Sequence, residues 1–143
     1  MYTDVFTNKQ GLHMAKVEIG STRQPMNLWL TSHETKMSVV KKGALNIDVP
    51  DKYDPALSTT AIYPATNGDD IEIFNLGPQG ARIKPVTITG NEIEDAVTMT
   101  FGNDLESSFR TIFVGIDGSV NEKLTKKTDG FLGLAPYTAG KEF

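Results

Sequence analysis

The stretch Asp129-Gly130-Phe131-Leu132-Gly133-Leu134-Ala135-Pro136 decides the fold of this chain of 143 residues. In it, a pair of large apolar residues stands between two glycines, a further apolar residue follows, and a proline closes the run. A short apolar run bounded by turn residues is typical of a strand buried in a sheet. We therefore expect these residues to form a buried strand, with other strands of the chain on either side of it.

The sequence before this stretch is a succession of short strand signals. Segments rich in Val, Ile, Thr and Phe alternate with clusters of Gly, Pro, Asn and Asp, which favour turns. Helical signals are weak, with one short turn expected at Glu122–Lys127. Many short strands in one domain predict a sandwich or a barrel. The predicted strands are His13–Ile19, Met26–Ser32, Lys36–Val40, Ile71–Phe74, Ile83–Thr89, Ala96–Phe101 and Thr111–Ile116.

Length and composition limit the possible functions. A chain of 143 residues suits one domain with a core, and its 38% hydrophobic and 22% charged residues are ordinary for a globular protein. The net charge of −4 argues against nucleic acid or an anionic membrane as partner, because both need clustered positive charge. The absence of cysteine excludes disulfides, cysteine zinc sites and thiol nucleophiles. No apolar run approaches the roughly 20 residues that span a bilayer.

Three further stretches occur in an informative order. They are IGSTRQPMNLWL at residues 19–30, YDPALSTT at 53–60 and DAVTMTFG at 95–102. Together with residues 129–136, they resemble the N-terminal lobe of pepsin-type aspartic proteases, in the family's order and with similar spacing. The resemblance covers roughly Val5 to Tyr137. It implies one pepsin-like lobe over residues 1–143, truncated at its C-terminal end: a closed or partly open β-barrel of short antiparallel strands with little helix. It also implies that the strand at 129–136 passes under the catalytic loop.

The catalytic loop departs from the family pattern. Where the family has Asp-Thr-Gly-Ser, this chain has Thr31, Ser32, His33 and Glu34. The family mechanism needs two aspartates that share a proton and activate a water. Thr31 offers only a hydroxyl, which cannot act as the general base, and His33 replaces the glycine that lets the backbone bend. Glu34 is too far along the loop to be a good substitute, so we expect no catalytic residue and no enzyme activity.

The flap is changed as well. The family closes a hairpin over its substrate, and a tyrosine hydroxyl in this hairpin helps to hold the active site. The corresponding flap-like segment here is Phe74, Asn75, Leu76 and Gly77, and no tyrosine stands at the matching position. We therefore expect a polar contact to substrate to be missing together with the catalytic acid.

No other stretch predicts a metal or cofactor site. The histidines, His13 and His33, are on separate strands without the spacing of zinc ligands. Glu92, Glu94 and Asp95 follow a Gly-Asn turn, and we interpret them as the solvated end of a hairpin rather than as a calcium loop. We expect the protein to use no metal and no cofactor.

Scaffold motifs beside a changed catalytic loop predict an interaction protein. A single lobe should leave strand edges or an apolar face open, and proteins normally cover these. The expected partner is another protein or a second copy of the chain, bound by strand addition. The alternative is one half of a two-chain aspartic-protease-like protein, a peptide binder or an impaired protease, whose second lobe is on another polypeptide.

The compartment is left open. The absence of cysteine, of an Asn-x-Ser/Thr acceptor and of a signal peptide in this chain favours the cytosol. The family precedent is secreted or vesicular and points the other way.

Overall fold

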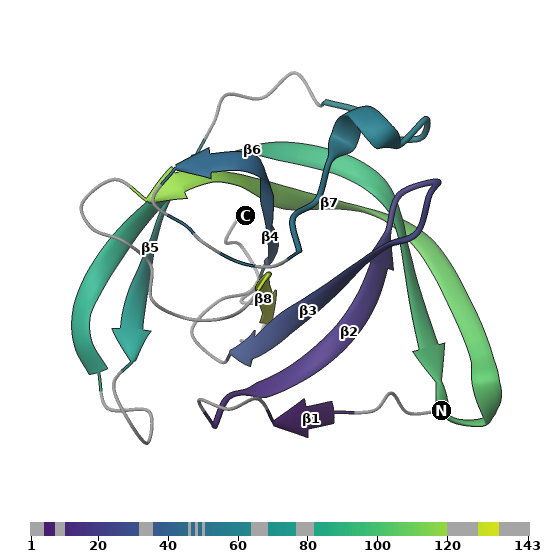
Figure 1. Cartoon of the computed structure of the whole chain (residues 1–143), viewed down its shortest axis with the longest axis horizontal. Coiled ribbons are helices and arrows are strands. Elements are labelled where there is room, and N and C mark those ends of the chain that lie inside the picture. The colour runs from purple at the N-terminus through teal and green to yellow at the C-terminus, as the bar shows by residue number, and fades with distance from the viewer. Residues whose placement is uncertain are drawn as a thin grey trace, which may run out of the picture.

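The computed structural model describes residues 5–7, 11–31, 36–45, 47, 49, 51–63, 69–76, 82–119 and 129–134, with the backbone only at 69–76, 82–88, 103 and 119. Nearly all of the described chain is β-strand (Figure 1), which confirms the all-β prediction. Its helical parts are two single 3-10 turns, Pro55–Leu57 and Gly102–Asp104. Within these residues there is no helix with the length and apolar character to cross a membrane. The strands are β1 (Val5–Thr7), β2 (His13–Ile19), β3 (Gln24–Thr31), β4 (Met37–Leu45), β5 (Asp69–Leu76), β6 (Arg82–Phe101), β7 (Leu105–Ser119) and β8 (Gly130–Gly133).

The eight described strands form one sheet whose hydrogen bonds close into a ring. The order is β1-β2-β3-β8-β4-β7-β6-β5, and β2 also pairs with β6 at Glu18↔Thr98 and Ile19↔Val97. This pairing joins β2, β3, β8, β4, β7 and β6 into the ring (Figure 1), while β1 and β5 lie outside it on β2 and β6. A closed ring removes strand edges and encloses a core.

The decisive stretch of the sequence forms β8, which lies between β3 and β4. It runs parallel to β3, with Trp29 opposite Phe131, and antiparallel to β4, with Ser38 opposite Phe131. A Cβ at Gly130 would overlap the Ser38 carbonyl, so only glycine allows this close approach. The prediction of a buried strand is confirmed for Gly130 and Phe131, both of which are buried. Six of the eight pairings among the described strands are antiparallel, as expected, whereas β3–β8 and β4–β7 are parallel.

The strands β6 and β7 are longer than predicted and form one long hairpin. The segments expected as separate strands at 83–89 and 96–101 belong to the single strand β6, and β7 extends to Leu105. The predicted turn at Gly90–Asn91 is instead an irregular point in the ladder, between Thr89 and Gly90. A Cβ at Gly90 would collide with the carbonyl oxygen of Gly115. The glycine at position 90 therefore allows β7 to approach β6 closely and does not mark a turn of the chain.

Two clusters of buried side chains fill the fold, and the central strands separate them. Trp29 and Phe131 belong to one cluster, with ring centroids 5.4 Å apart. Their sequence neighbours Leu28 and Leu132 pack in or against the other cluster. Because side chains alternate across a strand, β3 and β8 bury both faces. This explains why their sequences are nearly continuous apolar runs.

Candidate functional site

The first residue of the predicted loop, Thr31, lies at the end of β3. Thr31 is the last residue of β3 and is opposite Gly133 of β8, and it is buried with 5% of its surface exposed. Its carbonyl oxygen accepts a hydrogen bond of 2.8 Å from the N–H of Leu134. The N–H of Gly133 donates to the carbonyl of Lys36 at 3.1 Å. Thr31 and Lys36, on either side of the connection between β3 and β4, are therefore held by hydrogen bonds from the end of β8 and the residue that follows it.

Thr31 cannot supply the general base that the aspartic-protease mechanism requires. A threonine hydroxyl donates and accepts hydrogen bonds but does not ionise in the range where a general base works. The other three predicted loop positions, Ser32, His33 and Glu34, lie outside the described residues. Of the predicted loop, the structure therefore places Thr31 alone.

The flap-like segment falls in the hairpin of β5 and β6. Phe74 is opposite Pro85 and Asn75 is opposite Lys84, and the ladder shifts between Asn75 and Leu76. Gly77 lies outside the described residues. The predicted segment therefore includes the C-terminal end of β5, next to the connection into β6.

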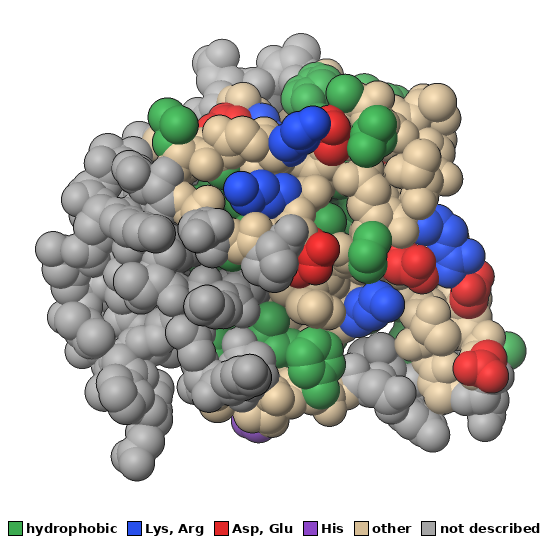
Figure 2. All heavy atoms as spheres, in the orientation of Figure 1, with side chains coloured by type: hydrophobic (Ala, Val, Ile, Leu, Met, Phe, Trp, Pro, Cys, Tyr) green, Lys and Arg blue, Asp and Glu red, His purple; other side chains and the backbone are tan. Residues whose placement is uncertain are grey.

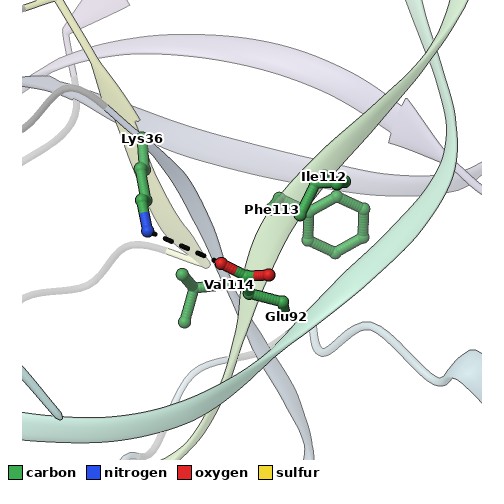
Figure 3. A pocket seen from close by; sticks show the side chains of 5 residues that line it. All are labelled: Lys36, Glu92, Ile112, Phe113 and Val114. Atoms are coloured by element: carbon green, nitrogen blue, oxygen red, sulfur yellow. Dashed lines mark ion pairs between the residues drawn. The ribbon is translucent and has the colours of Figure 1, made fainter. Parts of the chain in front are cut away.

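A small pocket lies where β4 first meets β7. It has a volume of about 210 Å³ and is lined by Lys36, Glu92, Ile112, Phe113 and Val114 (Figure 3). Lys36 and Glu92 point toward one another, with 3.7 Å between Nζ and Oε1, and their side chains are 26% and 15% exposed. Sites for drug-sized ligands have volumes of roughly 300–1,000 Å³, so this pocket suits a single side chain better than a cofactor.

The sequence analysis missed the pocket. Its residues come from the position just before β4, the middle of β6 and the middle of β7, which are far apart in the sequence. The parallel pairing of β4 with β7, at Ser38↔Val114, brings them together. No local pattern in the sequence predicts such a pairing.

A buried carboxylate at Asp95 fastens the segment 53–60 to β6. Asp95 is 0% exposed. Its Oδ2 accepts hydrogen bonds from the hydroxyls of Tyr53 at 2.6 Å and Ser58 at 2.7 Å. Its Oδ1 accepts from the Thr60 hydroxyl at 2.6 Å and from the Ala96 N–H at 2.7 Å. The interpretation of this acid as part of a solvated hairpin end is therefore wrong.

Hydrogen bonding keeps Asp95 ionised despite its burial. Burial raises the pKa of Asp95, but the hydrogen bonds from Thr60, Tyr53 and Ser58 outweigh it and leave the pKa below its usual range. Burial and the bond to Asp95 raise the pKa of Tyr53, so its hydroxyl stays a donor. With four donors and no exposed surface, this carboxylate is built for structure rather than for contact with a substrate.

A second buried acid, Asp129, stands just before β8. Its Oδ2 accepts a hydrogen bond of 2.8 Å from the N–H of Asn27, and 2% of its surface is exposed. Burial is the main cause that raises the pKa of Asp129 to about 6; the Asn27 N–H lowers it, and the carboxylate of Asp51 adds to the increase. Among the described acids with a shifted pKa, the pKa values of Asp95 and Glu106 are lowered and that of Asp129 is raised. Asp129 is therefore the one that titrates closest to neutral pH.

The remaining candidates do not form a metal centre in the part of the chain that the structure describes. His13 is exposed, and its Nδ1 lies 3.5 Å from the Thr7 hydroxyl. His33 is outside the described residues. Among the described residues, no three His, Cys, Asp or Glu side chains converge as metal ligands.

Comparison with known proteins found no relative from which a function could be transferred to this chain. No protein-family model matches the chain, and no curated protein matches it. The position of Thr31 beside β8, the strand edges and the exposed apolar side chains of β7 are therefore the features of the described residues that bear on function.

Proposed function

We propose that the chain is a non-catalytic lobe of the aspartic-protease type that acts as a protein-interaction or self-association module. The scaffold part of this proposal is supported by the position of β8 between β3 and β4. That is the course under the catalytic loop that the resemblance implies for residues 129–136. The parallel and antiparallel pairing of β8 with its two neighbours supports the same arrangement.

The non-catalytic part rests on Thr31. This residue ends β3 beside β8, where the mechanism would require a carboxylate, and its hydroxyl is buried. Two aspartates sharing a proton cannot be assembled when one position is a threonine, whether the second lobe is another copy or another protein.

A protease assay tests this part of the proposal. The purified chain, incubated with denatured protein substrates between about pH 3 and pH 7, is expected to leave them intact and to bind no pepstatin. An active pepsin-type enzyme serves as the positive control. Cleavage that pepstatin blocks and that Thr31→Ala abolishes would contradict the proposal, whereas cleavage unaffected by either points to a contaminant.

The interaction part is supported by open strand edges and exposed apolar side chains. In the described residues, β1 pairs only with β2, and β5 pairs only with β6. Leu105, Phe109 and Ile112 of β7 are between 44% and 53% exposed. An unpaired edge beside exposed apolar side chains is a surface that proteins normally cover. Light scattering during size exclusion is expected to give a mass above that of the monomer as concentration rises.

The alternative, one half of a two-chain protein, is favoured by the β5–β6 hairpin. The sequence analysis assigns a flap-like segment to this hairpin, and a flap has a use only over a cleft that a second lobe completes. Affinity purification of the native protein under mild conditions discriminates the two proposals. A stoichiometric second polypeptide of comparable size supports the two-chain form, and recovery of this chain alone supports self-association.

A further inference from the structure

The N-terminal half of β7 has an edge that no described strand covers. On one side β6 pairs with β7 from Leu105 onward. On the other side β4 begins at Met37, and its first partner in β7 is Val114. Among the described strands, the outer edge of Leu105–Phe113 is therefore unpaired. Figure 1 shows this half of the hairpin extending away from the ring.

The direction of the free backbone groups on this edge follows from the other side of β6. Glu94 exchanges two hydrogen bonds of 2.8 Å with Ile62, on the side of β6 that faces away from β7. Glu94 is opposite Ile112 in the ladder, so this is a non-hydrogen-bonded pair and the N–H and C=O of Ile112 point outward. Alternation along an antiparallel strand gives the same direction to Arg110, Ser108 and Glu106. These residues present the donors and acceptors that an added strand would use.

Charged side chains on the edge are arranged symmetrically about its centre. Glu106 and Arg110 stand two positions on either side of Ser108. Glu106 already pairs with Arg23 at 2.6 Å, and Arg110 with Glu94 at 3.1 Å. Figure 2 shows side chains of both signs next to one another on the right-hand side of the molecule. An edge with this pattern is complementary to itself when it is turned around.

We infer that two copies of this chain associate by antiparallel pairing of their β7 edges, about a two-fold axis at Ser108. The inference rests on the proposed interaction function and names its surface and its partner. In this register Glu106 of each copy is opposite Arg110 of the other, because an isologous contact repeats every pair. The ion pairs within the two copies are then joined into two symmetry-related rows of alternating charge. Each row runs from Glu94 and Arg110 of one copy to Glu106 and Arg23 of the other and crosses the interface once.

The charges also select this register over its neighbours. Pairing centred on Phe109 would put Arg110 opposite Ser108 and lose both cross-strand ion pairs. Pairing centred on Arg110 would put two guanidinium groups opposite each other, which is unfavourable. On the other face, the register centred on Ser108 puts Phe109 opposite Ser107 of the second copy, with Leu105 and Phe109 of that copy on the diagonals. Side chains that are 53% and 44% exposed in one copy are then partly covered.

Two charge reversals test the register. Glu106→Arg and Arg110→Glu each put like charges opposite one another twice in a homodimer. In an equimolar mixture of the two variants, the heterodimer restores both opposite-charge pairs. Sedimentation equilibrium is expected to show each variant alone with a dimer dissociation constant at least roughly ten-fold higher than that of the original chain, and the mixture close to the original. Each charge reversal also breaks an ion pair within its own copy, with Arg23 or with Glu94. This loss is the same in the homodimer and in the heterodimer, so it cancels when their dissociation constants are compared.

A control and a backbone variant complete the experiment. Lys42→Glu makes the same charge change as Arg110→Glu on a side chain of β4 that is 75% exposed, and it is expected to leave dimerisation unchanged. Ser108→Pro removes an outward N–H and leaves the backbone hydrogen bonds between β7 and β6 in place, while it also removes the 2.8 Å side-chain hydrogen bond between Ser108 and Thr98; it is expected to give a monomer. Hydrogen exchange of the original chain needs no variant. The amides of Glu106, Ser108 and Arg110 should become protected as concentration rises.

The outcomes separate this inference from the proposed function. A folded chain that stays monomeric at several hundred micromolar overturns the self-pairing. A dimer that withstands both charge reversals and Ser108→Pro overturns the surface. Protection of the same amides by an extended segment of a different protein, with no dimer, overturns the partner and leaves the interaction function standing. Pepstatin-sensitive cleavage overturns the proposed function without bearing on the dimer.

Discussion

The hydroxyl of Tyr53 shows how much a single group contributes to this fold. It donates a 2.6 Å hydrogen bond to the buried, ionised carboxylate of Asp95. Tyr53→Phe keeps the ring and leaves one acceptor position of Asp95 without its donor. Because hydrogen bonds to charged groups contribute roughly 1.5–3 kcal/mol, we expect the free energy of unfolding to fall by about that amount in urea titrations.

Tyr63→Phe is the control for this prediction, because the side chain of Tyr63 is 56% exposed. A surface hydroxyl has water as an alternative partner, so this change is expected to alter the free energy of unfolding by less than about 0.5 kcal/mol. Equal effects of the two substitutions would mean that the hydrogen bond from Tyr53 to Asp95 adds nothing to stability.

Asp129 gives the chain a pH dependence of its own. Its pKa of about 6 in the folded state lies above the ordinary value of 3.8, so the folded state binds this proton more tightly than the unfolded state. The pH dependence of the free energy of unfolding that Asp129 causes is therefore opposite to that of an acid in an ion pair. Asp129 adds stability as pH falls from 7 to 4, and it lowers stability above pH 6. Two pKa units correspond to on the order of 2–3 kcal/mol.

Asp129→Asn removes this titration and keeps an oxygen that can accept the Asn27 N–H. We expect the variant to be more stable than the original chain at pH 7 and to lose that advantage near pH 4. Urea unfolding at a series of pH values measures the difference between the two proteins, which cancels the opposite trend of Asp95 and Glu106. A difference that is constant from pH 7 to pH 4 would refute the raised pKa.

At the scale of the element, β8 depends on the absence of a side chain at Gly130. A Cβ there would overlap the Ser38 carbonyl and approach the Cα of Val39, both of which are backbone. Gly130→Ala must therefore push β8 away from β4, and we expect it to cost more than about 3 kcal/mol in chemical unfolding or to prevent folding.

Gly43→Ala is the companion substitution. Gly43 has a φ of +86°, and nothing lies within 4 Å of the Cβ position, so the only penalty is the left-handed backbone conformation. That penalty is about 1–2 kcal/mol. If the alanine at position 130 is tolerated as well as the one at position 43, β8 is not held as tightly between β3 and β4 as described.

Strands that are marked by a local sequence pattern were predictable from the sequence. The bounds of β2 agree with the prediction, because alternation and a glycine turn at its end mark the strand. The break predicted at Gly90 was wrong, because a glycine that admits a neighbouring strand looks the same in sequence as one that makes a turn. The three residues of β1 were missed, because their pairing with β2 is the only reason for them to be extended.

The candidate site was predictable only in part. The sequence named Thr31 because a motif surrounds it, and the structure places that residue at the end of β3 beside β8. The environment of Asp95 was not predictable, because its hydroxyl partners come from a segment about 35 to 42 residues earlier in the chain. The free edge of β7 was missed for the same reason: the edge is defined by where β4 begins to pair with β7, and no residue of β7 encodes that position.

At the scale of the whole molecule, the fold divides into a closed ring and a projecting hairpin end. The ring holds both buried clusters, and β3 and β8 lie between them. Beyond Ile112, toward the hairpin turn, the side chains of β7 are exposed or half-buried. Stability in such a molecule should fall from the ring toward the hairpin end, because fewer buried contacts oppose local opening there.

Hydrogen exchange in dilute solution measures this gradient, and it also reads the direction of the amides. The N–H groups of Trp29 and Phe131 are in the ring and should exchange only on global unfolding. Those of Ser107 and Phe109 face β6 and should exchange at least roughly a hundred-fold faster, through opening of the hairpin end. Those of Ser108 and Arg110 face outward and should exchange close to the rate of an unfolded peptide. If Ser108 is protected in dilute solution and Ser107 is not, the alternation deduced from the Glu94–Ile62 hydrogen bonds is reversed, and the β7 edge presents different residues to any partner.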